Sequence, residues 1–283
     1  MKNTFKFPIV DNHIHINIEY GFGIEPIKTF EKYGGTHIFL VSLPSWCYNI
    51  HINNPNDYKL LFEKTLYTAS LISKMTNIKV FPILGVHPIE ILYLKKDISI
   101  NEKINIICKG LEIASKYIKE KKAFGLKSGR PHFYVEDEIS NASNKILNYA
   151  FCLSKELNCP IQLHDKDMSF QNIYELYQIS KKYNINQYKI INHHSLPYVN
   201  ICKKYNIFPS ITAKLNYIEN AIHSGSRFVL ETDYFDDKKR PGAVLSTKTI
   251  PKNINKLINI YGEEIFWKIN KENIEKIYDI EIK

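Results

Sequence analysis

The sequence predicts an α/β protein built as a single (β/α)8 TIM barrel, with residues 1–283 forming one domain. Three observations lead to this prediction. Eight apolar, β-branched runs recur along the chain, stretches with helical periodicity lie between most of them, and polar side chains gather where the runs end. Continuous apolar runs are typical of parallel strands buried on both faces, and eight strand–helix units complete a barrel.

The expected strands follow one another from the N-terminus. They are FKFPIVDNHIH (5–15), THIFLVSLP (36–44), KVFPILGVHP (79–88), KAFGLKSG (122–129), CPIQLHD (159–165), YKIINHHS (188–195), IFPSIT (207–212) and RFVLETDY (227–234). Helical periodicity is clearest at 57–75 and 139–157, and closing helices are expected from about residue 248. A doubly wound open sheet is the alternative, but eight full units and the placement of the polar residues argue against it.

Composition excludes several classes of protein. Apolar residues make up 44% of the chain, enough for a core, yet no apolar run is long enough for a membrane span. The N-terminal segment lacks the apolar region of a signal peptide, so we expect a cytoplasmic protein. The five cysteines form no CxxC pair, which indicates reduced thiols and no disulfide framework.

The net charge of +9 gives weak support for a negatively charged substrate. Its lysines are spread along helical segments and form no single basic block. We expect the partner to be a small phosphorylated substrate or a DNA end, with no membrane and no obligate protein partner.

Polar residues at the ends of the expected strands predict a site. In an extended strand His13 and His15 project to the same side, with Asp11 one step behind. The other strand ends supply His87, Lys127, Arg130, His132, His164, Lys166, His193, His194, Glu231 and Asp233. Because the carboxyl ends of barrel strands converge on one face, these side chains are expected to meet there.

Part of this set suits metal ions. Four histidines and one aspartate, His13, His15, His164, His193 and Asp233, form a nitrogen and oxygen ligand set for one or two divalent ions. The residue types do not distinguish Zn, Mn, Mg, Ni or Fe. His193 and His194 are neighbours, so only one of them should enter the site, and we choose His193 by its motif.

Several motifs together resemble a known family. HxH on the first strand, QLH (162–164), a histidine on the sixth strand and LETD (230–233) resemble the amidohydrolase superfamily, and GVHP (85–88) with VLETDY (229–234) is most similar to TatD-type metal-dependent hydrolases. The resemblance covers essentially the whole chain. It implies a barrel hydrolase, often acting on phosphodiester bonds of DNA ends.

The resemblance also implies residue roles. His13 and His15 would bind one metal, and His164 and His193 the second. Asp233 would bind metal and act as general base, while His87 would contact the substrate.

One motif departs from the family pattern. TatD-type proteins carry a glutamate on the fourth strand that bridges two metals, whereas GLKSGRPH (125–132) contains no carboxylate and places Leu126 or Lys127 there. Three hypotheses for Lys127 follow. It is carbamylated and supplies the bridging carboxylate, or the site holds a single metal, or Lys127 stays cationic and binds an anion.

The expected function follows from these residues. Arg130 is the first candidate for binding phosphate, because a guanidinium contacts phosphate oxygens in a bidentate way, and Lys166 is the next. His132 is expected to face the pocket. The leading hypothesis is a metal-dependent phosphoesterase of the deoxyribonuclease type. The alternatives are an amidohydrolase or lactonase acting on a C–N or C–O bond, and a non-catalytic metal- or nucleic-acid-binding barrel.

Overall fold

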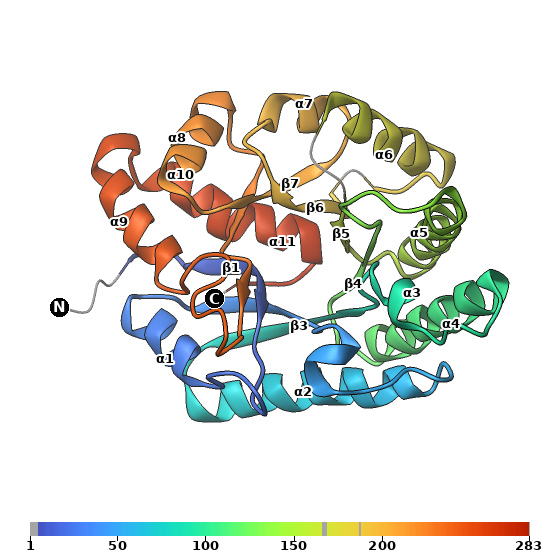
Figure 1. Ribbon diagram of the computed structural model, residues 1–283. Helices are drawn as coiled ribbons and strands as arrows, with labels where there is room; N and C mark the ends of the chain where they lie inside the picture. Colours follow the sequence, from blue (N-terminus) through green and yellow to red (C-terminus); the bar gives the residue numbers. More distant parts are fainter. Residues whose placement is uncertain (1–4, 166–168, 187, 283) are drawn as a thin grey trace.

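The computed structural model describes residues 5–165, 169–186 and 188–282. Its strands form one parallel sheet (Figure 1). They are β1 (Val10–His15), β2 (His37–Val41), β3 (Lys79–Gly85), β4 (Gly125–Gly129), β5 (Ile161–His164), β6 (Ile190–Ser195), β7 (Phe208–Thr212), β8 (Val229–Glu231) and β9 (Tyr234–Phe235). Each of the eight expected runs contains one of β1 to β8, so the TIM-barrel-like fold is confirmed.

The sheet curls until its two ends meet. Strands β1 to β8 pair in sequence order, and β9, which follows β8 closely, pairs with β1 on its free side. The carboxylate of Asp11 strengthens this junction. Its Oδ1 accepts the backbone N–H of Thr232 at 3.0 Å and its Oδ2 accepts the Thr232 hydroxyl at 2.5 Å. Asp11 therefore joins the ends of the sheet and does not enter the site with the two histidines that follow it.

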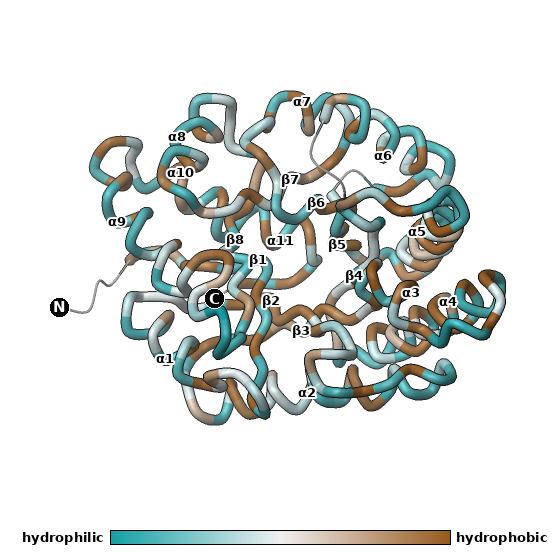
Figure 2. The backbone as a smooth tube through the Cα atoms, in the orientation of Figure 1, coloured by the Kyte–Doolittle hydropathy of each residue, from teal (hydrophilic) through white to brown (hydrophobic). Residues whose placement is uncertain are grey.

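Helices surround the sheet (Figure 1). They are α1 (Glu25–Lys32), α2 (Asp57–Met75), α3 (Glu90–Tyr93), α4 (Ile100–Lys119), α5 (Asp137–Leu157), α6 (Phe170–Lys182), α7 (Val199–Lys204), α8 (Leu215–Ser224), α9 (Thr249–Tyr261), α10 (Glu263–Trp267) and α11 (Asn273–Tyr278), with the 3-10 turn η1 (Ser45–Tyr48) and the π-helical turn η2 (Lys268–Glu272). Hydrophobic and hydrophilic segments alternate along them (Figure 2), as expected for helices with one face against a sheet. No helix within the described part of the chain is long and apolar enough to cross a membrane.

The C-terminal helices close the amino end of the barrel, as expected from residue 248 onward. Ile274, Ile277 and Tyr278 pack with apolar side chains of the strands in one core cluster. The amide of Asn270 accepts the backbone N–H of Val10 at 3.0 Å. A buried backbone N–H needs a hydrogen-bond acceptor, and Asn270 supplies it for Val10. The C-terminal helices thus both pack against the amino end of the barrel and satisfy a polar group there.

Gly129 at the end of β4 allows two strands to approach closely. Its φ is +149°, and a Cβ at this position would lie 1.7 Å from the carbonyl oxygen of His164. The following residue, Arg130, donates its backbone N–H to that carbonyl at 2.8 Å. Only glycine fits here, and its small size brings the end of β4 against the end of β5 where His164 projects.

Candidate metal centre

A cavity of about 530 Å³ lies at the carboxyl ends of the strands. Most of the predicted site residues line it, namely His15, His87, Lys127, His132, His164, His193 and Asp233. His194 also lines the cavity. The structure therefore brings together side chains from β1, β4, β5 and β6 and from the turns after β3, β4 and β8.

His13 and His15 direct one ring nitrogen each toward the other. Their Nε2 atoms are 3.1 Å apart. On the far side of each ring, Nδ1 faces an oxygen: Gln162 Oε1 at 2.5 Å from His13 and the Val41 carbonyl at 2.9 Å from His15. A carbonyl oxygen only accepts, so each Nδ1 carries the proton and each Nε2 presents a lone pair.

The orientation of Gln162 is fixed by its own partners. Its amide nitrogen donates to the backbone oxygen of Asn12 and to the Tyr278 hydroxyl, both at 2.8 Å. The amide oxygen must then face His13. This buried network determines the tautomer of His13, which is the usual role of the outer partner of a metal-binding histidine.

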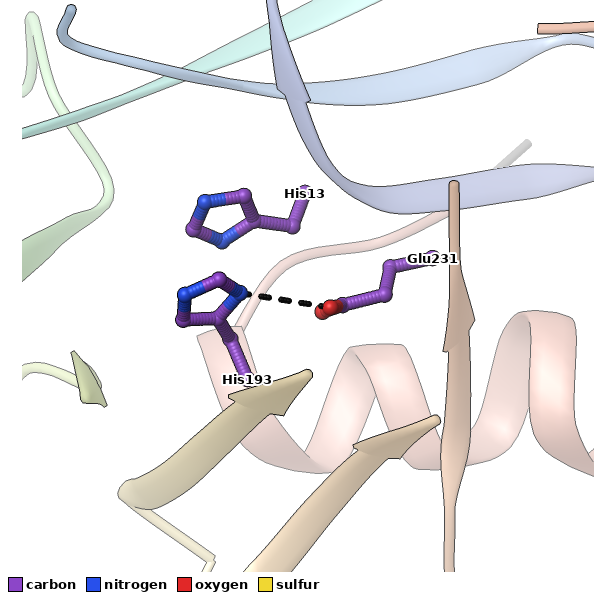
Figure 3. A group of neighbouring side chains, drawn as sticks. All are labelled: His13, His193 and Glu231. Carbon is purple, nitrogen blue, oxygen red and sulfur yellow. Dashed lines mark hydrogen bonds and ion pairs between the residues drawn. The ribbon is translucent and has the colours of Figure 1, made fainter. Parts of the chain in front are cut away.

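His164 and His193 form a second inward pair. His164 Nδ1 is 2.8 Å from His193 Nε2, and the ring of His193 stacks on that of His13 with centroids 4.0 Å apart. Figure 3 shows the two stacked rings and the carboxylate of Glu231, whose Oε1 is 3.2 Å from His193 Nδ1. Glu231 is thus the outer partner of His193, in the arrangement that orients many metal-bound histidines.

Glu231 is itself held by hydrogen bonds. It accepts the backbone N–H of His194 at 2.6 Å and the Ser210 hydroxyl at 2.5 Å. Burial, with the nearby charge of Asp233, nevertheless raises the pKa of this carboxyl well above its usual range. A positive charge close by would favour its ionised form.

His132 and His87 both lie next to His164. His132 Nδ1 is 2.8 Å from His164 Nε2, so His132 is the outer partner of His164. The ring centroid of His87 is 4.7 Å from that of His164. Both residues line the cavity, where they can contact a bound molecule.

The four inward histidines are neutral. Burial lowers the pKa of His15 to about 4 and holds the pKa values of His13, His164 and His193 well below their usual range, with a further lowering from the neighbouring Lys127 charge. Neutral imidazole is the form that binds metals. The state that burial favours is therefore the state that a metal requires.

Lys127 lies among the inward histidines. Its side chain is fully buried, and its Nζ is 3.2 Å from His13 Nε2. Burial lowers the pKa of this amine to about 7, although the charges of Asp233 and Glu231 oppose the shift. Lys127 thus points into the metal cluster, as the sequence predicts.

Asp233 and His194 have unusual backbone conformations. Their φ angles are +48° and +55°, in the left-handed region that non-glycine residues rarely adopt, and such strain concentrates at functional sites. The backbone N–H of Asp233 donates to the His13 carbonyl, and His194 Nδ1 is 3.0 Å from Asp233 Oδ2. The expectation that only one of the two histidines enters the site is wrong, because both line the cavity. His193 is buried and contacts the inward ring of His164, whereas His194 is half exposed.

The donor atoms form two overlapping groups that could hold an ion. One consists of His13, His15 and Asp233 and the other of His13, His193 and Glu231, with all ligand atoms in each group within 4.8 Å of one another. Neutral imidazoles with inward lone pairs and carboxylate oxygens match the ligand preferences of divalent transition metals. The residues therefore fit one or two divalent ions.

Arg130 is placed differently from the prediction. Its guanidinium makes a bidentate ion pair with Asp165, at 2.9 and 2.8 Å, and contacts Glu175 at 3.2 Å. The guanidinium is thus paired with two carboxylates, and Arg130 is not among the residues that line the cavity. The expected phosphate contact of Arg130 is unsupported because its donors are already used. Lys166, the second candidate, lies outside the described residues.

Three polar residues of the site were not assigned by the sequence. Glu231 was placed at a strand end but given no role, although it stands two residues before Asp233, the spacing that singled out His13 and His15. Gln162 and Asn192 gave no comparable signal. Asn192 lines the cavity, and its buried Oδ1 has no hydrogen-bond partner among the described residues. This atom can accept a hydrogen bond from a bound molecule.

A family model and a curated relative match nearly the whole chain. A family model described as TatD related DNase matches residues 10–279. An uncharacterized protein of Methanocaldococcus jannaschii is 36% identical over 282 residues, covering 98% of this chain and 97% of that protein.

Solved structures give the same picture of the fold. The TatD homologue YJJV from Escherichia coli superposes with a TM-score of 0.67 at 14% identity, covering 96% of this chain and 98% of that one. A mutant of a phosphotriesterase-like lactonase from Deinococcus radiodurans superposes with a TM-score of 0.60 at 12% identity, covering 95% of each chain.

Proposed function

The chain belongs to the TatD-related DNase family of metal-dependent hydrolases, and from this premise we propose that it hydrolyses phosphoester bonds, with DNA ends among its substrates. The observation that carries the proposal is the pair of Nε2 lone pairs of His13 and His15, 3.1 Å apart with both Nδ1 protons committed elsewhere. Lys127 Nζ, 3.2 Å from His13 Nε2, is the cationic group already near this pair, and a divalent ion would be shared by both lone pairs.

We assign the metal ligands to the inward side chains. They are His13, His15, Lys127, His164, His193 and Asp233, and Glu231 supports His193 from outside. Divalent ions held there would polarise the scissile bond and lower the pKa of a nearby water. The structure favours no particular metal.

The chain's own residues supply the proton transfer and the contacts with substrate. Asp233 takes the proton of the attacking water, since its partly exposed carboxylate reaches both the cavity and the histidines of β1. His194 orients this carboxylate through its 3.0 Å contact. His87 and His132 face the substrate from the side of His164.

Lys127 takes the place of the bridging glutamate by carrying a carbamate. The amine adds to CO2, the new N–C bond forms, and one proton leaves to solvent. The product would be a carboxylate attached to Nζ, which now lies 3.2 Å from His13 Nε2. Among the residues that the structure describes, no carboxylate lies within ion-pair distance of this buried amine.

The carbamate is tested by metal content. We expect wild type loaded in bicarbonate to bind about two ions per chain, Lys127→Met about one, and Lys127→Glu about two with or without bicarbonate. Lys127→Glu is the matched control because it encodes the missing carboxylate. A Lys127→Met variant that keeps the metal content of wild type would contradict the assignment.

A second candidate function is hydrolysis of a lactone or amide. Lys127 on the fourth strand favours it. The resemblance to TatD-type phosphodiesterases implies a glutamate on that strand, and this chain has none there. Bis(p-nitrophenyl) phosphate, an end-labelled oligonucleotide and a thiolactone separate the candidates when assayed with metal-loaded protein. Turnover of the first two supports the proposal. Turnover of the thiolactone alone supports the alternative, and full metal content without any turnover supports a non-catalytic binding barrel.

A further inference from the structure

Arg240 stands at the mouth of the cavity and has no role in the metal centre. It lies in the segment between β9 and α9 and lines the cavity together with the apolar residues Phe235, Ala243 and Val244. Apart from the histidines, the basic side chains among the described lining residues are Lys127, on the floor, and Arg240. The two therefore differ in depth, and of the two only Arg240 stands outside the proposed set of metal ligands.

The segment that carries Arg240 is anchored to the barrel. Asp236, which is buried, accepts the backbone N–H groups of Asn17 and Gly23 at 3.0 Å each and of Phe22 at 2.8 Å. The backbone N–H of Asp236 donates in turn to the carbonyl of His15 at 3.2 Å. The position of the segment is thus tied directly to the strand that supplies two of the metal ligands.

The guanidinium forms one ion pair through Nε and keeps both Nη groups available. Its Nε is 3.3 Å from Asp237 Oδ2, and it lies 5.4 Å from the centroid of the Phe235 ring. Within the described ranges neither Nη atom has a hydrogen-bond partner, and the side chain is 64% exposed. Arg130, by contrast, is 9% exposed and paired with two carboxylates.

We propose that Arg240 forms an anion subsite at the mouth of the cavity, which binds a second negatively charged group of the substrate beside the group undergoing hydrolysis. The proposal rests on the proposed function only in taking the metal centre as the place of reaction. The ligand class is a molecule with two anionic groups, either two phosphates or a phosphate and a carboxylate. A guanidinium with free Nη donors suits both.

Binding of non-hydrolysable anions to metal-loaded protein tests the subsite. Methylphosphonate has one anionic group, whereas phosphonoacetate and 3-phosphonopropionate add a carboxylate at two distances. We expect Arg240→Gln to weaken binding of at least one phosphonocarboxylate by roughly 10- to 100-fold, the range for hydrogen bonds to a charged group, and to leave methylphosphonate within about 2-fold. Arg240→Lys should restore part of the affinity.

The control is Lys239→Gln, which removes the same charge from an exposed neighbour that does not line the cavity. Equal weakening of all the ligands, equal weakening in the control variant, or no weakening in Arg240→Gln would each overturn the subsite. Metal content is measured after every titration, so that loss of metal is not mistaken for loss of the subsite. A chain that shows the expected binding but hydrolyses no phosphoester would remove the proposed function and leave the subsite in place.

Discussion

Both ends of the barrel bury histidines, but the ring nitrogens face different partners at the two ends. His15 at the carboxyl end and His37 at the amino end are almost fully buried, and burial lowers the pKa of each to about 4. His37 Nδ1 is 2.7 Å from the Thr36 hydroxyl, and its ring stacks on Phe81. His15 instead directs Nε2 at the Nε2 of His13.

This difference shows what identifies a metal ligand. Burial and a lowered pKa are common to both histidines and do not separate them. The convergence of unprotonated ring nitrogens does. The amino end satisfies its polar groups with the backbone and with the closing helices, whereas the carboxyl end leaves lone pairs directed at one another.

The largest expected effect is at Asp233. Asp233→Asn should lower kcat by about 10²- to 10⁴-fold at saturating metal, because the amide cannot take the proton of the attacking water. Stability should change little, since the Asp233 backbone hydrogen bond to His13 remains. Steady-state hydrolysis of bis(p-nitrophenyl) phosphate gives kcat, and thermal unfolding gives the stability. A variant that keeps most of its kcat would remove Asp233 as the base.

The barrel and much of the site could be predicted from the sequence. The eight runs carry the apolar signal of buried parallel strands, and His13, His15, His164 and His193 follow from residue type and strand position. In each case the information is local, because a strand end and its polar residue are adjacent in the chain.

Other features depend on contacts between distant segments. Arg130 follows a strand end like the histidines do, but its partners come from elsewhere in the chain. Asp165 follows β5 and Glu175 lies in α6, and no local sequence pattern indicates that they pair with Arg130. Gln162 acquires its role from Asn12 and Tyr278, which are far away in the chain. By strand alternation Asp11 is expected on the same side of β1 as His13. The closed sheet instead places its carboxylate against Thr232.

The next effect compares two buried amides. Gln162→Leu should weaken metal binding by about 10- to 100-fold, because His13 loses the partner that fixes its tautomer. Asn270→Leu is the matched control at the amino end, where the amide accepts the Val10 N–H. Each substitution leaves a buried group unpaired and should cost about 1–3 kcal/mol of stability. Only Gln162→Leu should change the metal affinity.

Metal titration followed by chemical denaturation separates these outcomes. Equal loss of metal affinity in the two variants would mean that general destabilisation, and not the orientation of His13, controls the site. Gln162→Glu sharpens the result, because it keeps an acceptor oxygen for His13 Nδ1 and should retain metal binding better than Gln162→Leu.

The smallest effect concerns His37 and the pH dependence of stability. The imidazole has a pKa near 6.5 in the unfolded chain and about 4 in the folded protein. Between these values the unfolded state binds more protons, so the stabilising contribution is fully present above about pH 6.5 and is lost as the pH falls toward 4. The loss between pH 7 and pH 5 is about 2 kcal/mol from this residue.

His37→Gln removes that contribution without touching the site. The variant should be less stable than wild type at pH 7, because it loses the ring packed on Phe81, and the gap should shrink by about 2 kcal/mol at pH 5. Urea unfolding of metal-free wild type and variant at both pH values measures the change. A gap that stays constant would mean that His37 gains its proton without cost, and that the amino end is less fully satisfied than its hydrogen bonds indicate.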